Sequence, residues 1–181
     1  MGSAMSNFHQ ELKFDPDRGA FFLNGLRHAF LRPETLSEIQ KGVEDRLGSK
    51  AGEFLYAAGA SWAIAALQRL HAAGASNPEV LLQSLCTLAT NLGWGRFVVE
   101  SWKPDIPKMS VRVIGSPFAE AYGQSDSPVC HLLAGVVGGA LEGLFSVMSN
   151  CIESACKAQG AADCVFVASG QDVTGKENWG W

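Results

Sequence analysis

The sequence contains few charged residues and no dense run of basic ones. Aspartate, glutamate, lysine and arginine make up 18% of the 181 residues, and the formal net charge is −4 at pH 7. Proteins that bind nucleic acid or anionic membranes use clustered lysines and arginines to neutralise phosphate charge. The composition therefore predicts that neither nucleic acid nor an anionic membrane surface is a partner.

An uninterrupted apolar run long enough to cross a bilayer is also missing. The closest stretch, residues 131–148, contains His131 and Glu142 and is short for a membrane span, so we expect a buried helix there. Residues 1–6 lack the charged and apolar regions of a secretory signal, and we interpret them as an expression scar. We expect a cytoplasmic protein without a membrane span.

Sequence motifs for cofactors and covalent catalysis are lacking as well. No Gly-x-Gly-x-x-Gly follows a predicted strand, and no Ser-His-Asp or Cys-His order stands out. The nearest glycine-rich text, residues 93–98, precedes a predicted strand and lacks the last glycine. The sequence therefore favours a binding protein over an enzyme.

Hydrophobic residues are plentiful, at 47%, and predict one globular domain over residues 7–181. Asn24-Gly25 predicts the turn of an N-terminal hairpin between 21–23 and 26–31. Three helices should follow: Pro33 to Leu47, Ser49 as cap to about Ala73, and Asn77-Pro78 to before Gly93. The first of these should turn a stripe of four apolar residues to the core, namely Leu36, Ile39, Val43 and Leu47.

The second half of the chain is richer in β-branched and aromatic residues. Arg96–Trp102 and Ser110–Ile114 read as paired strands. Ser127 as cap and Pro128 at the first position predict a long helix that ends near Asn150. A final hairpin should span residues 151–168 around Gly160. The fold class is α/β (α+β), with a hairpin, a helical layer and an antiparallel sheet.

The predicted long helix carries Gly135, Gly139 and Gly143 at four-residue intervals, with Gly138 beside them. Each helical glycine costs about 1 kcal/mol relative to alanine, so a close neighbour must offset the loss. One explanation is tight packing against another backbone or across a dimer seam. The other is the wall of a ligand cavity.

The cysteines indicate a metal site. Cys86 lies on an apolar stripe and should be a core residue. The other four surround Glu153 and are Cys130, Cys151, Cys156 and Cys164. Without a secretory signal, such a cluster predicts a zinc site, or else buried structural cysteines, rather than disulfides. On an ideal strand Glu153 and Cys156 point to opposite faces, so a shared ion requires a bulge or a turn between them.

The spacing of Cys130, Glu153, Cys156 and Cys164 resembles that of the 4-vinyl reductase (4VR) domain family. Residues 19–31, 116–121, 125–130 and 153–160 support the resemblance, which extends over about 18–170. It implies that these four residues, without Cys151, hold a structural zinc in a closed, non-catalytic site.

The same resemblance implies a function. Family members include the effector-binding domains of phenol- and aromatic-responsive activators, bacteriochlorophyll biosynthesis proteins and archaeal hydrocarbon-binding proteins, and they are similar in fold to TRAPP-type subunits. A homodimer is implied, with a buried cavity for a small hydrophobic ligand (a hydrocarbon, an aromatic or a tetrapyrrole-like molecule). As a sensor or carrier, the chain would pass its signal to a partner protein.

The residues that would flank this ligand cavity lie on the predicted strands and on the glycine-bearing helix; they are Phe97, Trp102, Phe118, Tyr122, Gly135, Gly139 and Phe145. The alternative is that the aromatic ones are ordinary core residues. The histidine and tryptophan that anchor the hydroxyl in phenol sensors have no matching position here, which argues against phenol. Two other functions stay open: a scaffold subunit with a structural lipid, and a component of a tetrapyrrole vinyl reductase.

Overall fold

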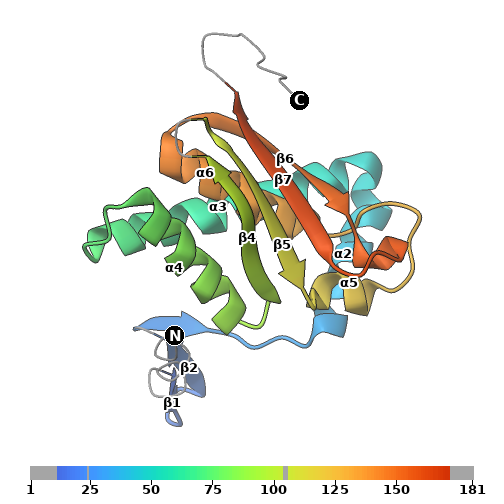
Figure 1. Cartoon of the computed structure of the whole chain (residues 1–181). Coiled ribbons are helices and arrows are strands. Elements are labelled where there is room, and N and C mark those ends of the chain that lie inside the picture. Colours follow the sequence, from blue (N-terminus) through green and yellow to red (C-terminus); the bar gives the residue numbers. More distant parts are fainter. Residues whose placement is uncertain (1–11, 24, 104–105, 172–181) are drawn as a thin grey trace.

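The computed structural model describes residues 12–23, 25–103 and 106–171, which form a small N-terminal sheet, a helical layer and a four-stranded sheet (Figure 1). In chain order the elements are β1 (Leu12–Asp15), β2 (Ala20–Leu23), β3 (Leu26–His28), α2 (Pro33–Leu47), the 3₁₀ turn η1 (Gly48–Lys50), α3 (Ala51–Ala72), α4 (Pro78–Asn91), β4 (Arg96–Lys103), β5 (Lys108–Ile114), α5 (Pro117–Tyr122), α6 (His131–Phe145), β6 (Met148–Ala155), the 3₁₀ turn η2 (Lys157–Gln159) and β7 (Cys164–Gln171).

The four-stranded sheet is antiparallel, in the order β4-β5-β7-β6, and α3 and α6 lie behind it in Figure 1. Its other face is polar, since Arg112 Nε donates to Glu100 Oε1 at 2.7 Å there. Alternate side chains of the central strands fill the core: Met109, Val111, Val113, Cys164, Phe166 and Ala168. The sheet thus buries one face and exposes the other, and the predicted strand pair and final hairpin are confirmed.

Helices α3 and α6 approach each other very closely because α6 presents glycines to α3. A methyl group at Gly135 would overlap the carbonyl oxygen of Tyr56. A methyl group at Gly139 would lie 2.5 Å from the Cα of Ala60. Of the two explanations for the glycine line, packing against another backbone is the one that the structure shows.

Helix α2 has the predicted boundaries but turns a different face to the core. Ile39 and Leu47 of the predicted inward stripe are 53% and 45% exposed, whereas Ser37 and Gln40 are buried. Gln40 Nε2 donates to the carbonyl oxygen of Val129 at 2.8 Å, which fixes the polar side of the helix inward. The prediction that Ile39 and Leu47 point to the core is therefore wrong.

The predicted caps of α3 and α4 have different outcomes. The Asn77 side chain accepts hydrogen bonds from the backbone N–H of Glu79 and Val80, so the predicted start of α4 is confirmed. Ser49 instead lies in η1, and Lys50 takes the cap position of α3 without a side-chain bond. The prediction of Ser49 as cap is wrong because a 3₁₀ turn joins α2 directly to α3.

Helix α6 begins three residues after the predicted start at Pro128. The Ser125 backbone N–H donates to the carbonyl oxygen of Ala158 at 2.9 Å, and Gln159 Nε2 donates to that of Asp126 at 3.0 Å. These bonds hold the segment before α6 against η2 in a non-helical path. Ser127 therefore does not cap the helix, whose first residue is His131.

The helix also ends earlier than predicted, at Phe145 rather than near Asn150. Ser146 adopts a left-handed conformation with φ +54°, which stops the helix. The chain then enters β6 at Met148, so the last hairpin begins three residues before the predicted Cys151.

Helix α5 and strand β1 are elements that the sequence does not predict; β1 adds a third strand to the predicted N-terminal hairpin. Asn24 of that hairpin's turn and the interpreted scar at residues 1–6 lie outside the described residues. Within the described part of the chain, no helix combines the length and the hydropathy that a membrane span requires.

Candidate metal centre and apolar cavity

The four predicted metal ligands converge at one end of the four-stranded sheet. Cys130 stands at the start of α6, Glu153 on β6, Cys156 directly before η2, and Cys164 at the start of β7. One ligand atom from each lies within 4.8 Å of every other, and the sulfurs of Cys130 and Cys164 are 3.7 Å apart. No second group of three or more histidine, cysteine, aspartate or glutamate side chains converges in this way among residues 12–23, 25–103 and 106–171.

A β-bulge brings Glu153 and Cys156 to the same place. The pairing of β6 with β7 shifts register between Glu153 and Ala155, which leaves Ser154 as an extra residue in β6. The extra residue changes the alternation of side chains, so that Cys156 turns toward the side of Glu153. The irregularity that the sequence required between these two residues is confirmed.

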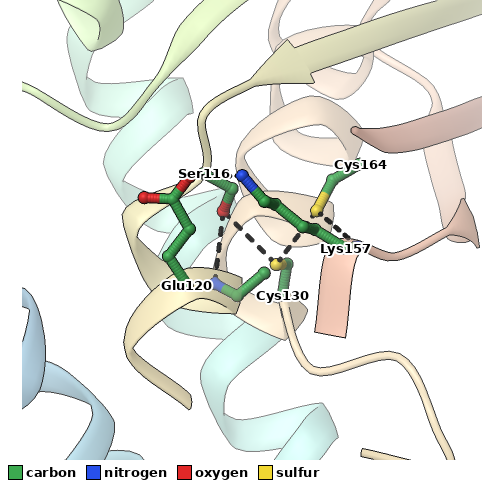
Figure 2. Close-up of polar contacts among 6 residues, drawn as sticks. Ser116, Glu120, Cys130, Lys157 and Cys164 are labelled. Carbon is green, nitrogen blue, oxygen red and sulfur yellow. Dashed lines mark hydrogen bonds and ion pairs between the residues drawn. The ribbon is translucent and has the colours of Figure 1, made fainter. Parts of the chain in front are cut away.

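Polar contacts hold the cluster from several elements (Figure 2). The hydroxyl of Ser116, just before α5, lies 3.5 Å from the Cys130 sulfur. The Lys157 backbone N–H donates to the Cys164 sulfur at 3.4 Å, and that of Cys130 donates to Glu153 Oε2 at 2.9 Å. These donors favour sulfur and oxygen atoms that carry negative charge.

The ligands perturb one another's protonation. Hydrogen bonds from Cys130 lower the pKa of Cys156 and of Cys164, and the same two bonds, helped by burial, raise the pKa of Cys130. Burial, followed by a hydrogen bond with Cys156, raises the pKa of the Glu153 carboxyl. Acidic groups this close together resist ionising together unless a cation lies among them.

The cluster has the donor set and the open valence of a cation site. Glu153 Oε1 is buried and has no hydrogen-bond partner among the described residues, so a bound cation would satisfy it. Cys151 stays outside: its thiol points to the Ile152 carbonyl oxygen at 3.9 Å. The remaining three sulfurs and one carboxylate oxygen could hold a metal ion.

A small apolar cavity lies in the core between α4, β4 and α6. Its volume is about 10 Å³, close to the space that one water molecule needs. Only one of the predicted pocket residues, Phe97, is part of its wall. Its full lining is Leu82, Leu85, Cys86, Ala89, Phe97, Val136, Val137 and Ala140.

The other predicted aromatic pocket residues lie in three separate places. Trp102 stacks on Phe145 with ring centroids 5.3 Å apart. Phe118 meets Trp94 edge to face at 6.1 Å. Tyr122 lies on the outer side of α5, where its hydroxyl donates to Glu44 Oε2 at 2.7 Å.

The two predicted pocket glycines, Gly135 and Gly139, face α3 and are absent from the cavity wall. The residues that do line the cavity include four from α4 at helical spacing. The sequence showed that stripe, but an apolar stripe looks the same whether it borders a filled core or a cavity.

Comparison with known proteins gives one family match and several similar structures. Residues 109–169 match the family model of the vinyl-4-reductase (4VR) domain, and no curated protein matches the chain. The phenol-responsive sensory domain of the transcription activator PoxR aligns with a TM-score of 0.78 at 20% identity, covering 92% of this chain and 88% of that one.

Two further solved structures share the fold. A vinyl-4-reductase family protein from Methanocaldococcus jannaschii aligns with a TM-score of 0.55 at 17% identity, over 80% of this chain and 85% of that one. A trafficking protein particle complex subunit 3 from Naegleria fowleri aligns with a TM-score of 0.56 at 13% identity, over 77% of this chain and 95% of that one.

These findings agree with the geometry of the chain. The matched segment runs from β5 to β7 and contains all four residues of the metal cluster. The structural likeness extends to the helices and confirms the expected mixed fold, which is of the 4VR and TRAPP-like type. The chain is a single-domain protein of helices and sheet that carries a 4VR domain.

Proposed function

We propose that this chain binds a small apolar molecule in the cavity between α4, β4 and α6, as a sensor or carrier, and that zinc occupies its metal centre as a structural ion. The observation that carries the proposal is the cavity itself, which is lined by apolar side chains in the middle of the domain. The PoxR sensory domain, which shares the fold, was solved with phenol, a molecule of the size that such a site takes.

The cavity wall favours a hydrocarbon over a phenol. Among the described lining residues, the Cys86 thiol is the one side chain with a hydrogen-bonding group. Burying a hydroxyl without a partner costs about 1–3 kcal/mol. An aromatic hydrocarbon such as toluene therefore suits this site better than phenol.

Binding requires the cavity to open, because its present volume of about 10 Å³ cannot hold an aromatic ring. We assign the moving wall to α4. The loops at its two ends contain Gly74 and Gly93, with φ of +101° and +81°, conformations that glycine adopts without strain. An outward shift of α4 about these loops would enlarge the cavity and leave the sheet and α6 in place.

The test is calorimetric titration of the full chain with toluene and with phenol. Toluene should bind about 10-fold or more tightly than phenol, as the hydroxyl cost requires. Ala140→Leu, which fills the cavity, should weaken toluene binding, and Val136→Ala, which enlarges it, should strengthen binding.

The matched control is Val80→Ala, because Val80 lies on the outer side of α4 and is 51% exposed. It should leave toluene binding unchanged. Failure of both ligands to bind, or equal effects of Val80→Ala and Ala140→Leu, would contradict the proposed site.

Zinc is proposed from the donor set, since three thiolates and one carboxylate complete a tetrahedral site without an open position. Elemental analysis should find about one zinc per chain. Cys164→Ser should lose most of it, whereas Cys151→Ser, which alters a buried cysteine outside the cluster, should retain it. Equal zinc content in the two variants would contradict the assignment. The output partner and the cytoplasmic location stay predictions.

A further inference from the structure

Helix α2 forms an open groove with the start of α3, on the outside of the protein. The groove has a volume of about 440 Å³. Its walls are the apolar side chains Ile39, Val43, Leu47 and Phe54, with Gly42 between them and the charged residues Glu38 and Arg46 beside it. It lies apart from both the metal cluster and the internal cavity, whose residues it does not share.

The apolar side chains of this groove have no cover within the described part of the protein. Ile39 is 53% exposed, Leu47 45% and Phe54 57%, while the buried residues of α2 are Ser37 and Gln40. A surface helix normally places its apolar stripe inward. The reversed arrangement concentrates apolar area on the surface, which is typical of an interaction site.

The charges on α2 are arranged symmetrically about Gly42. Glu38 precedes Gly42 by four residues and Arg46 follows it by four, so all three share one row of the helix. At a rise of about 1.5 Å per residue, each charge lies about 6 Å from Gly42 along the axis. Rotation of the helix by 180° about a line through Gly42 places Arg46 at the level of Glu38.

We propose that this groove binds a second copy of the same chain, with the two α2 helices antiparallel and a two-fold axis at Gly42. Glu38 of each protomer then meets Arg46 of the partner subunit, and Ile39, Leu47 and Phe54 of both copies cover one another. Such an isologous contact requires a surface complementary to itself, which this charge arrangement provides.

Local contacts leave these groups free to take part. Glu38 is exposed and lies 3.8 Å from Lys41, a loose surface pair of little energetic value. A methyl group at Gly42 would meet a single neighbour within 4 Å, the flexible end of Arg46. The space above Gly42 is therefore open, and the second helix can approach closely.

The test is sedimentation equilibrium of the full chain, in which the wild type should be a dimer. Ile39→Glu and Phe54→Glu place a charge in the apolar contact twice per dimer and should weaken association by about 100-fold or more. Ile152→Glu is the matched control, since Ile152 on β6 is 53% exposed, as Ile39 is. It should leave association unchanged.

A charge exchange tests the antiparallel register. Glu38→Arg and Arg46→Glu should each weaken the homodimer by about 5-fold, because each variant brings like charges together at two places. An equimolar mixture of the two variants should associate as tightly as the wild type, since the arginine introduced in one chain then meets an arginine-free position, with the introduced glutamate of the other chain opposite it.

A monomeric wild type overturns the proposal, and so does a dimer that survives Ile39→Glu and Phe54→Glu. Equal loss of association in Ile152→Glu would also overturn it. A mixture of Glu38→Arg and Arg46→Glu that fails to regain association overturns the pairing about Gly42. None of these outcomes depends on toluene binding or zinc content.

Discussion

Helices α2 and α6 have the same length, 15 residues, and opposite relations to the core. Helix α6 is buried without a break from Leu133 to Leu141, whereas the buried residues of α2 are the polar Ser37 and Gln40. Backbone contact explains α6, because its glycines let α3 lie against it. A hydrogen bond explains α2, because Gln40 reaches the Val129 carbonyl oxygen. Burial thus follows the partner that each face meets, and hydrophobicity alone does not decide it.

Removal of the metal should have the largest effect, and it should affect α6 alone of the two helices. Cys130 at the start of α6 is one of the four clustered residues. A strong chelator should lower the free energy of unfolding by about 5 kcal/mol or more, since folding includes metal binding. Thermal unfolding with and without chelator measures this loss.

Hydrogen exchange should locate the effect of the chelator. The first turn of α6 and the β6–β7 hairpin should exchange faster, whereas α2 should be unchanged. An unaltered melting temperature after verified loss of the metal would contradict the prediction.

The next largest effect should come from the contact between α6 and α3. Gly135→Ala places a methyl group against the carbonyl oxygen of Tyr56, and backbone on both sides must move. We expect a loss of about 3 kcal/mol in the free energy of unfolding, measured by urea denaturation.

Gly143→Ala is the matched control for this substitution. Its methyl group would meet the end of the Leu67 side chain at 2.8 Å, which a rotamer change relieves. A loss as large as that of Gly135→Ala would show that the two glycines do not differ in this way.

The polar inner face of α2 gives a smaller effect. Gln40→Leu removes the donor to the Val129 carbonyl oxygen and leaves that oxygen buried and unpaired. The free energy of unfolding should fall by about 1–2 kcal/mol. Gln83→Leu, an exposed glutamine on α4, should change the same urea transition little; a gain in stability from Gln40→Leu would mean that α2 prefers an apolar inner face.

The smallest effect should have the opposite sign. Gly42→Ala adds a methyl group with one flexible neighbour, Arg46 Nη1 at 3.6 Å, and removes a helix-weakening glycine. The free energy of unfolding should rise by about 0.5–1 kcal/mol in urea denaturation at low protein concentration. Gly42→Ala and Gly135→Ala therefore separate an open helix face from a closed one, and a loss for both would remove that distinction.

The metal cluster could be predicted from sequence more fully than the cavity could. Thiols and a carboxylate at a fixed spacing have few other uses, and the strand parity of Glu153 and Cys156 even required a bulge. The cavity has no such chemistry, because its walls are the same residues that fill any core. Of the aromatics proposed for it, Phe97 lines it, while Trp102 and Phe145 stack on each other.

The errors in the fold have a common cause in long-range contacts. Residues 127–128 read as a helix start, but bonds from residues 125 and 126 to η2 keep the segment extended. Gln40 turns α2 because Val129, 89 positions away, offers an acceptor. Local patterns predicted the start of α4, which depends on the Asn77 cap, and failed where distant residues compete.

The extra residue in β6 has a consequence for how this protein tolerates change in length. Deleting Ser154 would restore a regular ladder between β6 and β7 and swing Cys156 to the far side of the sheet. All four ligands would still be written in the gene, yet no ion could bridge them. Natural variants of this hairpin should therefore accept exchanges of side chain at position 154 far more readily than the loss of the residue itself.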